Sequence, residues 1–192
     1  MTKAELRKHY RAIRSSLTEQ ETNRFNEQII SHLLAFSWED VRYVHCFLPI
    51  GRHKEPDMWA FMDIVQERFP NLQMVVSRSN VIDFSMVHYL FSRSLILTEN
   101  EWGIVEPLDG ERVVESLLDV VLVPLLVADD RGNRVGYGKG FYDRFLARCR
   151  PDCVKIGISF FEPVELITDV DTLDIPLDKL VTPLSVFDFK AS

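Results

Sequence analysis

The sequence predicts a single-domain α/β fold over residues 1–192, with three α/β/α layers and a mostly parallel central sheet, Rossmann-like in its architecture. Three observations predict this class. Segments rich in Val, Leu and Ile alternate with segments of helical periodicity. The run LLDVVLVPLLVAD, residues 117–129, is the most apolar in the chain, as expected of a strand covered on both faces. The length of 192 residues suits one domain, and no linker or repeat interrupts it.

Two helices are expected at the start of the chain. Thr2 with Glu5, and Thr18 with Glu21, have the spacing of a capping box, in which each residue of the pair bonds the other's backbone. Apolar residues recur at helical spacing between positions 25 and 36, which indicates that the second helix turns one face to a core.

The next segments alternate between strand and helix. Residues 43–48, YVHCFL, predict a buried strand, and a helix over residues 58–69 follows with Asp57 as its cap. Residues 73–77 predict a second strand, and the weak alternation of residues 82–90 suits a third.

The second half of the chain contains the strongest strand signal. Pro124 lies inside the apolar run and cannot donate a backbone hydrogen bond, so we expect a bulge or a strand end there. Residues 141–149 predict a helix, and residues 154–160 and 185–189 predict the last strands. In sheets of this kind ligands bind where the carboxyl ends of the strands meet the loops.

The charge and the residue composition of the chain argue against several classes of function. The formal net charge of −7 argues against non-specific binding of nucleic acid, because phosphate contacts supply most of that affinity. No apolar run approaches the ~18 residues of a membrane span, and the charged N-terminus is not a signal peptide, so we expect no membrane partner and a cytoplasmic protein. The cysteines Cys46, Cys149 and Cys153 lack zinc or redox spacing and are expected to be reduced.

The most informative segment is GNRVGYGKGFYD, residues 132–143, between the apolar strand and the helix that follows. It is not a Walker loop, because Asn133 stands where that loop needs glycine and no Ser or Thr follows Lys139. It is not a dinucleotide fingerprint either, because Phe141 occupies the third glycine position.

The segment nevertheless has the chemistry of a phosphate site. Glycines at 136, 138 and 140 let backbone amides approach an anion beside a helix N-terminus. Arg134 and Lys139 can pair with phosphate oxygens, and Asp143 so near to phosphates implies a bridging Mg²⁺. The alternative is a glycine-rich hairpin whose Asp143 only complements the helix dipole. The combination of glycines, cations and acid favours phosphate binding.

The extended segment GNRVGYGKGFYDRFL resembles the signature of the 5-formyltetrahydrofolate cyclo-ligase family, also called methenyltetrahydrofolate synthetases. The likeness covers nearly the whole chain. The other matching elements, in the family's order, are KAELR at 3–7, FLPIG at 47–51, EPD at 55–57, WGI at 102–104, EP at 106–107 and DIPLD at 174–178.

The resemblance implies a cytoplasmic, monomeric enzyme for small molecules, with ATP as co-substrate and Mg²⁺ as cofactor. Such an enzyme converts 5-formyltetrahydrofolate into 5,10-methenyltetrahydrofolate and releases ADP and phosphate. Transfer of the γ-phosphoryl group to the formyl oxygen would give an iminium phosphate. N10 then attacks the formyl carbon and phosphate leaves. The protein's task is alignment and stabilisation of charge.

The resemblance also assigns site residues. The ATP site is matched by Lys3, Arg7, Arg134, Val135, Gly136, Tyr137, Gly138, Lys139, Gly140, Phe141 and Tyr142. The folate site is matched by Leu48, Glu55, Trp102, Tyr137, Gly138, Lys139, Gly140 and Phe141. Lys139 and Arg134 are the catalytic candidates, and Asp143 and Asp174 are the metal candidates. Position 137 is tyrosine where some members of the family carry arginine.

Each assignment has a plainer alternative. Lys3 and Arg7 share one helical face and could be an ordinary solvated basic stripe. Asp174 could be a turn residue, Trp102 could be part of the core, and Asp57 is the fallback for Glu55. Two other functions remain open: a non-catalytic folate- or nucleotide-binding relative, and a sugar-phosphate isomerase of similar architecture, which needs a general base and no ATP.

Overall fold

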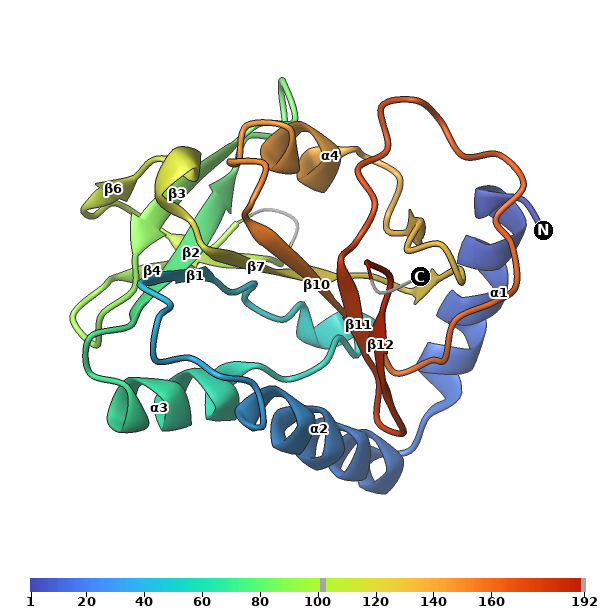
Figure 1. The fold of residues 1–192 in the computed structure, drawn as a ribbon, viewed down its shortest axis with the longest axis horizontal. Coiled ribbons are helices and arrows are strands. Elements are labelled where there is room, and N and C mark those ends of the chain that lie inside the picture. The colour runs from blue at the N-terminus through green and yellow to red at the C-terminus, as the bar shows by residue number, and fades with distance from the viewer. Residues whose placement is uncertain (101–102, 191–192) are drawn as a thin grey trace.

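The computed structural model describes residues 1–100 and 103–190 (Figure 1). An eight-stranded sheet forms its centre, in the order β12-β11-β10-β7-β1-β2-β3-β6. The strands are β1 (Tyr43–His45), β2 (Gln73–Ser79), β3 (Met86–Leu90), β6 (Arg112–Val113), β7 (Val120–Pro124), β10 (Val154–Ile158), β11 (Lys179–Val181) and β12 (Val186–Asp188). The five strands from β11 to β2 pair in parallel, and antiparallel strands complete both edges. The predicted mostly parallel sheet is therefore confirmed.

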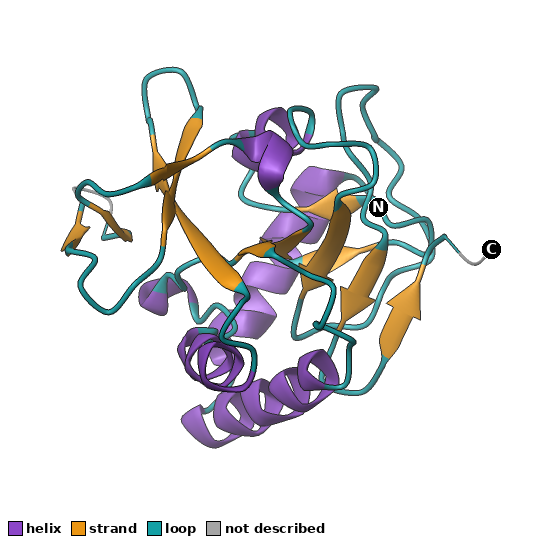
Figure 2. Cartoon of the chain, turned by 60° about the vertical axis from the view of Figure 1, so that its left-hand side comes forward, coloured by secondary structure: helices purple, strands orange, loops and turns teal. Residues whose placement is uncertain are grey.

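Helices cover both faces of this sheet, as Figure 2 shows. They are α1 (Lys3–Ser16), α2 (Glu19–Leu34), α3 (Trp59–Arg68) and α4 (Phe141–Leu146), with 3-10 turns η1 (Gly51–His53) and η2 (Glu115–Leu117). Apolar side chains of α2 and α3 pack with Val44, Met74 and Leu122 in one core. Side chains of α4 pack with Val121 and Val123 in a second core on the opposite face. Alternate residues of β7 thus enter different cores, which confirms the three-layer prediction.

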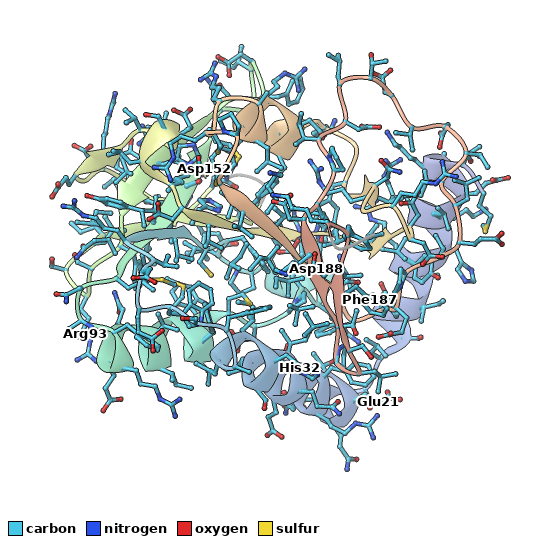
Figure 3. The ribbon with its side chains drawn as sticks, in the orientation of Figure 1. Glu21, His32, Arg93, Asp152, Phe187 and Asp188 are labelled. Carbon is cyan, nitrogen blue, oxygen red and sulfur yellow. The ribbon has the colours of Figure 1, made fainter. Side chains whose placement is uncertain are left out.

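Both opening helices begin as predicted. The side chains of Thr2 and Thr18 cap α1 and α2, and Glu5 and Glu21 complete the two capping boxes. Figure 3 labels His32 on α2 near the β11–β12 hairpin, where its Nε2 lies 3.3 Å from the carbonyl oxygen of Pro183. This contact helps to hold α2 against the β11–β12 hairpin, which forms one side edge of the sheet.

The structure corrects several boundaries. The N-cap of α3 is Met58 rather than Asp57, whose carboxylate instead accepts a bond from the amide of Trp59 at 2.9 Å. The helix predicted over residues 141–149 is α4 and ends at Leu146. The strand predicted over residues 43–48 ends at His45, although the chain stays buried through Leu48.

The apolar run is not one strand. β7 ends at Pro124, as the missing donor predicts, and the chain then forms β8 (Val127–Ala128), which pairs antiparallel with β9 (Arg134–Val135). The glycine segment therefore begins with a short hairpin rather than directly with a loop. A second small sheet joins β4 (Leu97–Glu99) to β5 (Val105–Pro107).

Topology decides where the loops meet. β10, β7 and β1 are adjacent and parallel, so the segments that follow them leave the same edge of the sheet. Along the chain, β1 leads to the neighbouring β2 on one side, whereas β7 leads to β10 on the other. The gap between β1 and β7 is a topological switch point, the usual ligand site of such sheets.

Candidate active site

Three segments meet at this edge of the sheet, and α1 lies along them (Figure 1). Residues 46–58 follow β1, residues 125–140 follow β7, and residues 159–178 follow β10. The N-terminal end of α1 is fixed to the third segment: the carbonyl of Met1 accepts from the amide of Thr168 at 3.1 Å, and the amide of Lys3 donates to Asp169 at 2.6 Å.

One face of α1 presents a row of four cations to this region. Lys3, Arg7, Arg11 and Arg14 are spaced by four, four and three residues, which places them on one side of a helix. All four contact residues of the second or third segment. Lys3 and Arg7 were predicted as site residues; Arg11 and Arg14 were not, although their helical spacing is visible in the sequence.

At the N-terminal end of the row, two ion pairs lie close together. Lys3 pairs with Asp174. Arg134 pairs with Asp143 at 2.7 Å and also donates to the carbonyl of Ile175. The amide of Ile175 donates to Asp143 at 3.2 Å. The structure therefore brings Asp143 and the residue beside Asp174 into direct contact, although they are distant in the sequence.

The glycine segment is shaped by the arginine that faces it. Nε of Arg7 donates to the carbonyl of Gly136 at 2.9 Å. Gly138 has φ +84°, and a Cβ at this position would lie 3.0 Å from the Arg7 guanidinium. Gly140 has φ +71° and immediately precedes α4. The left-handed backbone at these two positions is the conformation that glycine adopts without steric cost.

At the C-terminal end of the row, two buried ionic side chains and the partly buried Tyr137 form a chain of hydrogen bonds. Arg14 donates to the hydroxyl of Tyr137 at 2.5 Å, and this hydroxyl donates to Oε1 of Glu55 at 2.5 Å. Oε2 of Glu55 accepts from the amide of Ile50 at 2.7 Å. The two ionic groups are deeply buried, with Arg14 3% and Glu55 6% exposed.

This environment raises the pKa of Glu55 and Tyr137 and lowers the pKa of His53. Burial raises the pKa of Glu55, while the hydrogen bonds from Tyr137 and Ile50 and the charge of Arg14 act against that rise. Burial and the nearby Glu55 carboxylate raise the pKa of Tyr137, so its hydroxyl keeps its proton. Burial and then the neighbouring arginines lower the pKa of His53, whose ring lies 4.9 Å from that of Tyr137.

Lys139 lies apart from this buried chain. Its side chain is exposed, and its ammonium lies 5.8 Å from the centre of the Phe84 ring at the tip of the β2–β3 hairpin. Phe141 contacts the same ring edge-on, with centroids 5.5 Å apart. Phe84 has φ +58°, an uncommon value for an aromatic residue, and is thus held where these side chains converge.

The remaining predicted residues occupy different places. Val135 and Leu48 are buried and belong to apolar clusters, so their side chains serve packing. Tyr142 is partly buried beside His45, with ring centroids 6.0 Å apart, and its burial raises its pKa. Trp102 lies outside the described residues.

A further polar cluster joins His45, Ser77 and His88, which were not predicted to lie together. The hydroxyl of Ser77 lies 2.7 Å from Nε2 of His45 and 2.7 Å from Nδ1 of His88. Burial lowers the pKa of both histidines, to about 4 for His88. These residues come from three neighbouring strands, so only the strand order could reveal their contact.

The carboxylates provide oxygen ligands suited to Mg²⁺. Within the described residues no three His, Cys, Asp or Glu side chains gather as a complete metal site. The side chains of Asp143 and Asp174 are 29% and 19% exposed. Asp143 pairs with Arg134, and Asp174 pairs with Lys3. Mg²⁺ usually takes one or two carboxylates and completes its shell with water and phosphate oxygens, so this donor set fits the ion.

The chain is similar to known proteins over most of its length. The family model described as the 5-formyltetrahydrofolate cyclo-ligase family matches residues 1–183. The 5-formyltetrahydrofolate cyclo-ligase of Mus musculus is 26% identical over 188 residues, which cover 93% of this chain and 90% of the mouse protein. A probable 5-formyltetrahydrofolate cyclo-ligase of Schizosaccharomyces pombe is 32% identical over 114 residues, 52% of this chain and 56% of the yeast protein.

Solved structures show the same fold. The 5,10-methenyltetrahydrofolate synthetase of Aquifex aeolicus is 31% identical, with a TM-score of 0.83 over 99% of this chain and 94% of the other. A 5,10-methenyltetrahydrofolate synthetase from Mycoplasma pneumoniae has a TM-score of 0.75 at 22% identity, over 95% of this chain and 99% of the other, and supports the fold alone.

In the described part of the chain, no helix has the length and apolar character needed to span a membrane.

Proposed function

The chain belongs to the 5-formyltetrahydrofolate cyclo-ligase family, and from this premise we propose that ATP drives its cyclisation of 5-formyltetrahydrofolate through a phosphorylated formyl intermediate. The family and the relatives indicate 5,10-methenyltetrahydrofolate synthetase activity. The proposal adds that ATP supplies the energy, that a phosphorylated formyl intermediate forms, and which residues bind the substrates. It also takes residues 1–192 as one domain that works as a monomer in the cytoplasm.

The observation that carries the proposal is the convergence of α1 and the glycine segment at the switch point. Arg7 contacts Gly136 and Gly138, and Lys3 and Arg134 pair with carboxylates beside them. A triphosphate needs such a place, where a glycine-rich backbone and several cations lie together. A sugar-phosphate isomerase would need a general base at the reacting carbon, whereas Asp143 is paired with Arg134 and Glu55 accepts hydrogen bonds from Tyr137 and Ile50.

The proposed reaction begins with alignment. Lys3, Arg7 and the amides of the glycine segment hold the phosphates, while Arg134 and Lys139 stabilise negative charge on the transferring phosphoryl group. The formyl oxygen takes the phosphoryl group and ADP leaves. N10 then attacks the formyl carbon, which closes the ring; the C–O bond to phosphate breaks, N10 releases its proton, and the methenyl bridge forms. Because the formyl group is an amide, its oxygen leaves only after this activation.

Asp143 and Asp174 would hold Mg²⁺, which neutralises phosphate charge when bound. In the present structure both carboxylates are paired with cations, so binding of the ion would exchange one set of partners for another. Their partial exposure suits this exchange.

Glu55 is the proposed anchor for the pterin ring. A carboxylate can accept two hydrogen bonds from an amino group and a ring N–H at once. Tyr137, Gly138, Lys139, Gly140 and Phe141 would lie where folate and ATP meet. Trp102 is proposed as a stacking partner for the pterin or the aminobenzoate ring.

The direct test mixes the pure protein with Mg-ATP and 5-formyltetrahydrofolate and follows the methenyl chromophore together with ADP. We expect one ADP for each methenyl product, and no product without ATP or without Mg²⁺. Folate binding without turnover would identify the protein as a non-catalytic relative. Product formation without ADP would contradict the phosphorylated intermediate.

A further inference from the structure

Arg14 is a buried charge whose place needs an explanation. It is 3% exposed, lies in the last turn of α1 and forms no ion pair within the described residues. Its Nε atom is buried and has no hydrogen-bond partner among the residues that the structure describes. A buried guanidinium without a carboxylate partner is costly, so such a group is retained where it serves another purpose.

The partner that Arg14 does have is Tyr137. A phenol has one proton to donate and accepts through its oxygen. Here the proton goes to Glu55, and the oxygen accepts from Arg14. The tyrosine therefore connects a cation to a carboxylate in a fixed direction, with both bonds at 2.5 Å.

We propose that Arg14 is a positioning residue of the folate site, which acts through Tyr137 to keep Glu55 ionised and aimed at the incoming pterin. This inference rests on the proposed function, because it takes Glu55 as the pterin anchor. Arg14 itself touches neither the folate nor the reacting atoms. It determines the state of the group that does.

The lone pairs of Glu55 show why this arrangement suits a ligand. Oε1 takes the proton of Tyr137 and Oε2 takes the amide of Ile50, so each oxygen still has an acceptor site. Two parallel donors, such as an amino group and a ring N–H, can fill both remaining sites without displacing either protein bond. The carboxylate is thus held in one orientation before the ligand arrives.

The charges around Glu55 set the pH at which the site works. Arg14 acts on it from α1, Tyr137 from the glycine segment and Tyr142 from α4. Arg11 and the ring of His53 lie one step further away, against the ring of Tyr137. Burial raises the pKa of Glu55 and Arg14 opposes this rise. Removal of Arg14 would therefore raise the pKa of Glu55 further, and the loss of folate binding on acidification would begin at a higher pH.

The test measures folate binding and turnover in three variants of the full chain: Arg14→Gln, Arg14→Lys and Tyr137→Phe. Dissociation constants for 5-formyltetrahydrofolate are determined by calorimetry from pH 5.5 to 8.5, and KM is determined for both substrates. Lys8→Gln is the matched control, because Lys8 is exposed on the same helix. The profile is repeated in a His53→Asn background, so that titration of His53 is removed.

We expect Arg14→Gln to weaken folate binding at least tenfold near pH 6 and less at pH 8, with the acid midpoint moved to higher pH. KM for ATP should stay within about twofold. Arg14→Lys should restore most of the binding, because the charge is kept. Tyr137→Phe should reproduce the loss, and the double variant Arg14→Gln/Tyr137→Phe should lose no more than either single variant, since both break one connection.

Unchanged folate affinity and an unchanged acid midpoint in folded Arg14→Gln would overturn the inference. So would parallel rises in KM for folate and ATP, or a lower melting temperature with normal binding, because these indicate a purely structural arginine. If Arg14→Gln does not fold, Tyr137→Phe and Arg14→Lys decide by the same criteria. A wild-type protein that does not bind folate would overturn the proposed function as well, whereas wild-type binding with unaffected variants rejects the inference alone.

Discussion

The two ends of the cation row on α1 use charge differently. At the open end, which comprises Lys3, Asp174, Arg134 and Asp143, cations pair directly with carboxylates that solvent can reach. At the closed end, which comprises Arg14, Tyr137 and Glu55, the charges are buried and separated by a phenol.

The difference reflects what each end is proposed to bind. Ion pairs whose carboxylates solvent can reach contribute less net stability than fully buried ones, so their members can change partners when phosphates and a metal ion arrive. A buried carboxylate with fixed hydrogen bonds cannot rearrange cheaply, but it presents one acceptor pattern to one kind of ring. The open end therefore suits a flexible, highly charged nucleotide, and the closed end suits a rigid heterocycle.

The largest expected effect concerns Lys139, the exposed cation of the glycine segment. Lys139→Ala should lower turnover by about 10³-fold, because it removes a charge that stabilises the transferring phosphoryl group. The melting temperature should hardly change, because the side chain is exposed and its ammonium lies over the face of Phe84. Steady-state kinetics and calorimetry check both parts.

Lys139→Arg is the conservative control and should retain more activity than the alanine variant. A Lys139→Ala protein that melts early but turns over normally would show that this lysine serves the fold. The proposed role of the open end in charge stabilisation would then be wrong.

The next effect tests the closed end. Glu55→Gln should raise KM for 5-formyltetrahydrofolate by about 10- to 100-fold, since hydrogen bonds to a charged acceptor are stronger than those to an amide. KM for ATP should change little, because the phosphates are proposed to bind at the other end. Asp57→Asn is the matched control, as this exposed carboxylate lies two residues away. A larger effect at Asp57 than at Glu55 would transfer the anchor to Asp57.

A smaller effect is expected at Asp143. Asp143→Asn should raise the Mg²⁺ concentration for half-maximal activity by about tenfold, because a neutral amide is a weaker ligand for a hard cation. Titration of Mg²⁺ at saturating ATP measures this. Asp152→Asn, at an exposed carboxylate that pairs with Arg150, is the control. An unchanged Mg²⁺ requirement in Asp143→Asn would leave this carboxylate as a partner of Arg134 only.

The smallest effect concerns the backbone that connects the two ends. Gly138→Ala should cost about 1–2 kcal/mol of unfolding free energy, because φ +84° strains a residue with a Cβ, and the melting temperature should fall by about 2–8 °C. Gly136→Ala is the control for stability, since a Cβ there meets nothing within 4 Å. Equal shifts in both variants would show that the left-handed turn at Gly138 is not the cause.

Much of the fold could be predicted from local patterns. The capping boxes at Thr2 and Thr18 set the starts of two helices, and Pro124 set the end of β7 through its missing donor. Boundaries were less accurate where tertiary contacts decide them, as at the end of α4. The antiparallel pairing of β8 with β9 was not predicted, because a short hairpin and a loop share the same glycine-rich composition.

The site was predictable in part. The glycine segment, with Arg134 and Asp143, could be recognised because residues close in sequence carry the whole signal. The contact of Arg14 with Tyr137 joins residues 123 positions apart, and that of Tyr137 with Glu55 joins residues 82 apart. No local pattern connects such residues.

The sequence by itself determined the alternation of helices and strands, the gathering of glycines, two cations and an acid in one segment, and the spacing that puts Lys3 and Arg7 on one helical face, because each depends on neighbours along the chain. Only the tertiary structure decided which cations meet a carboxylate directly and which one, Arg14, reaches Glu55 through Tyr137. The physical reason is that strand order and parallel pairing bring the three segments to one edge, and burial at that edge then sets how strongly each charge acts.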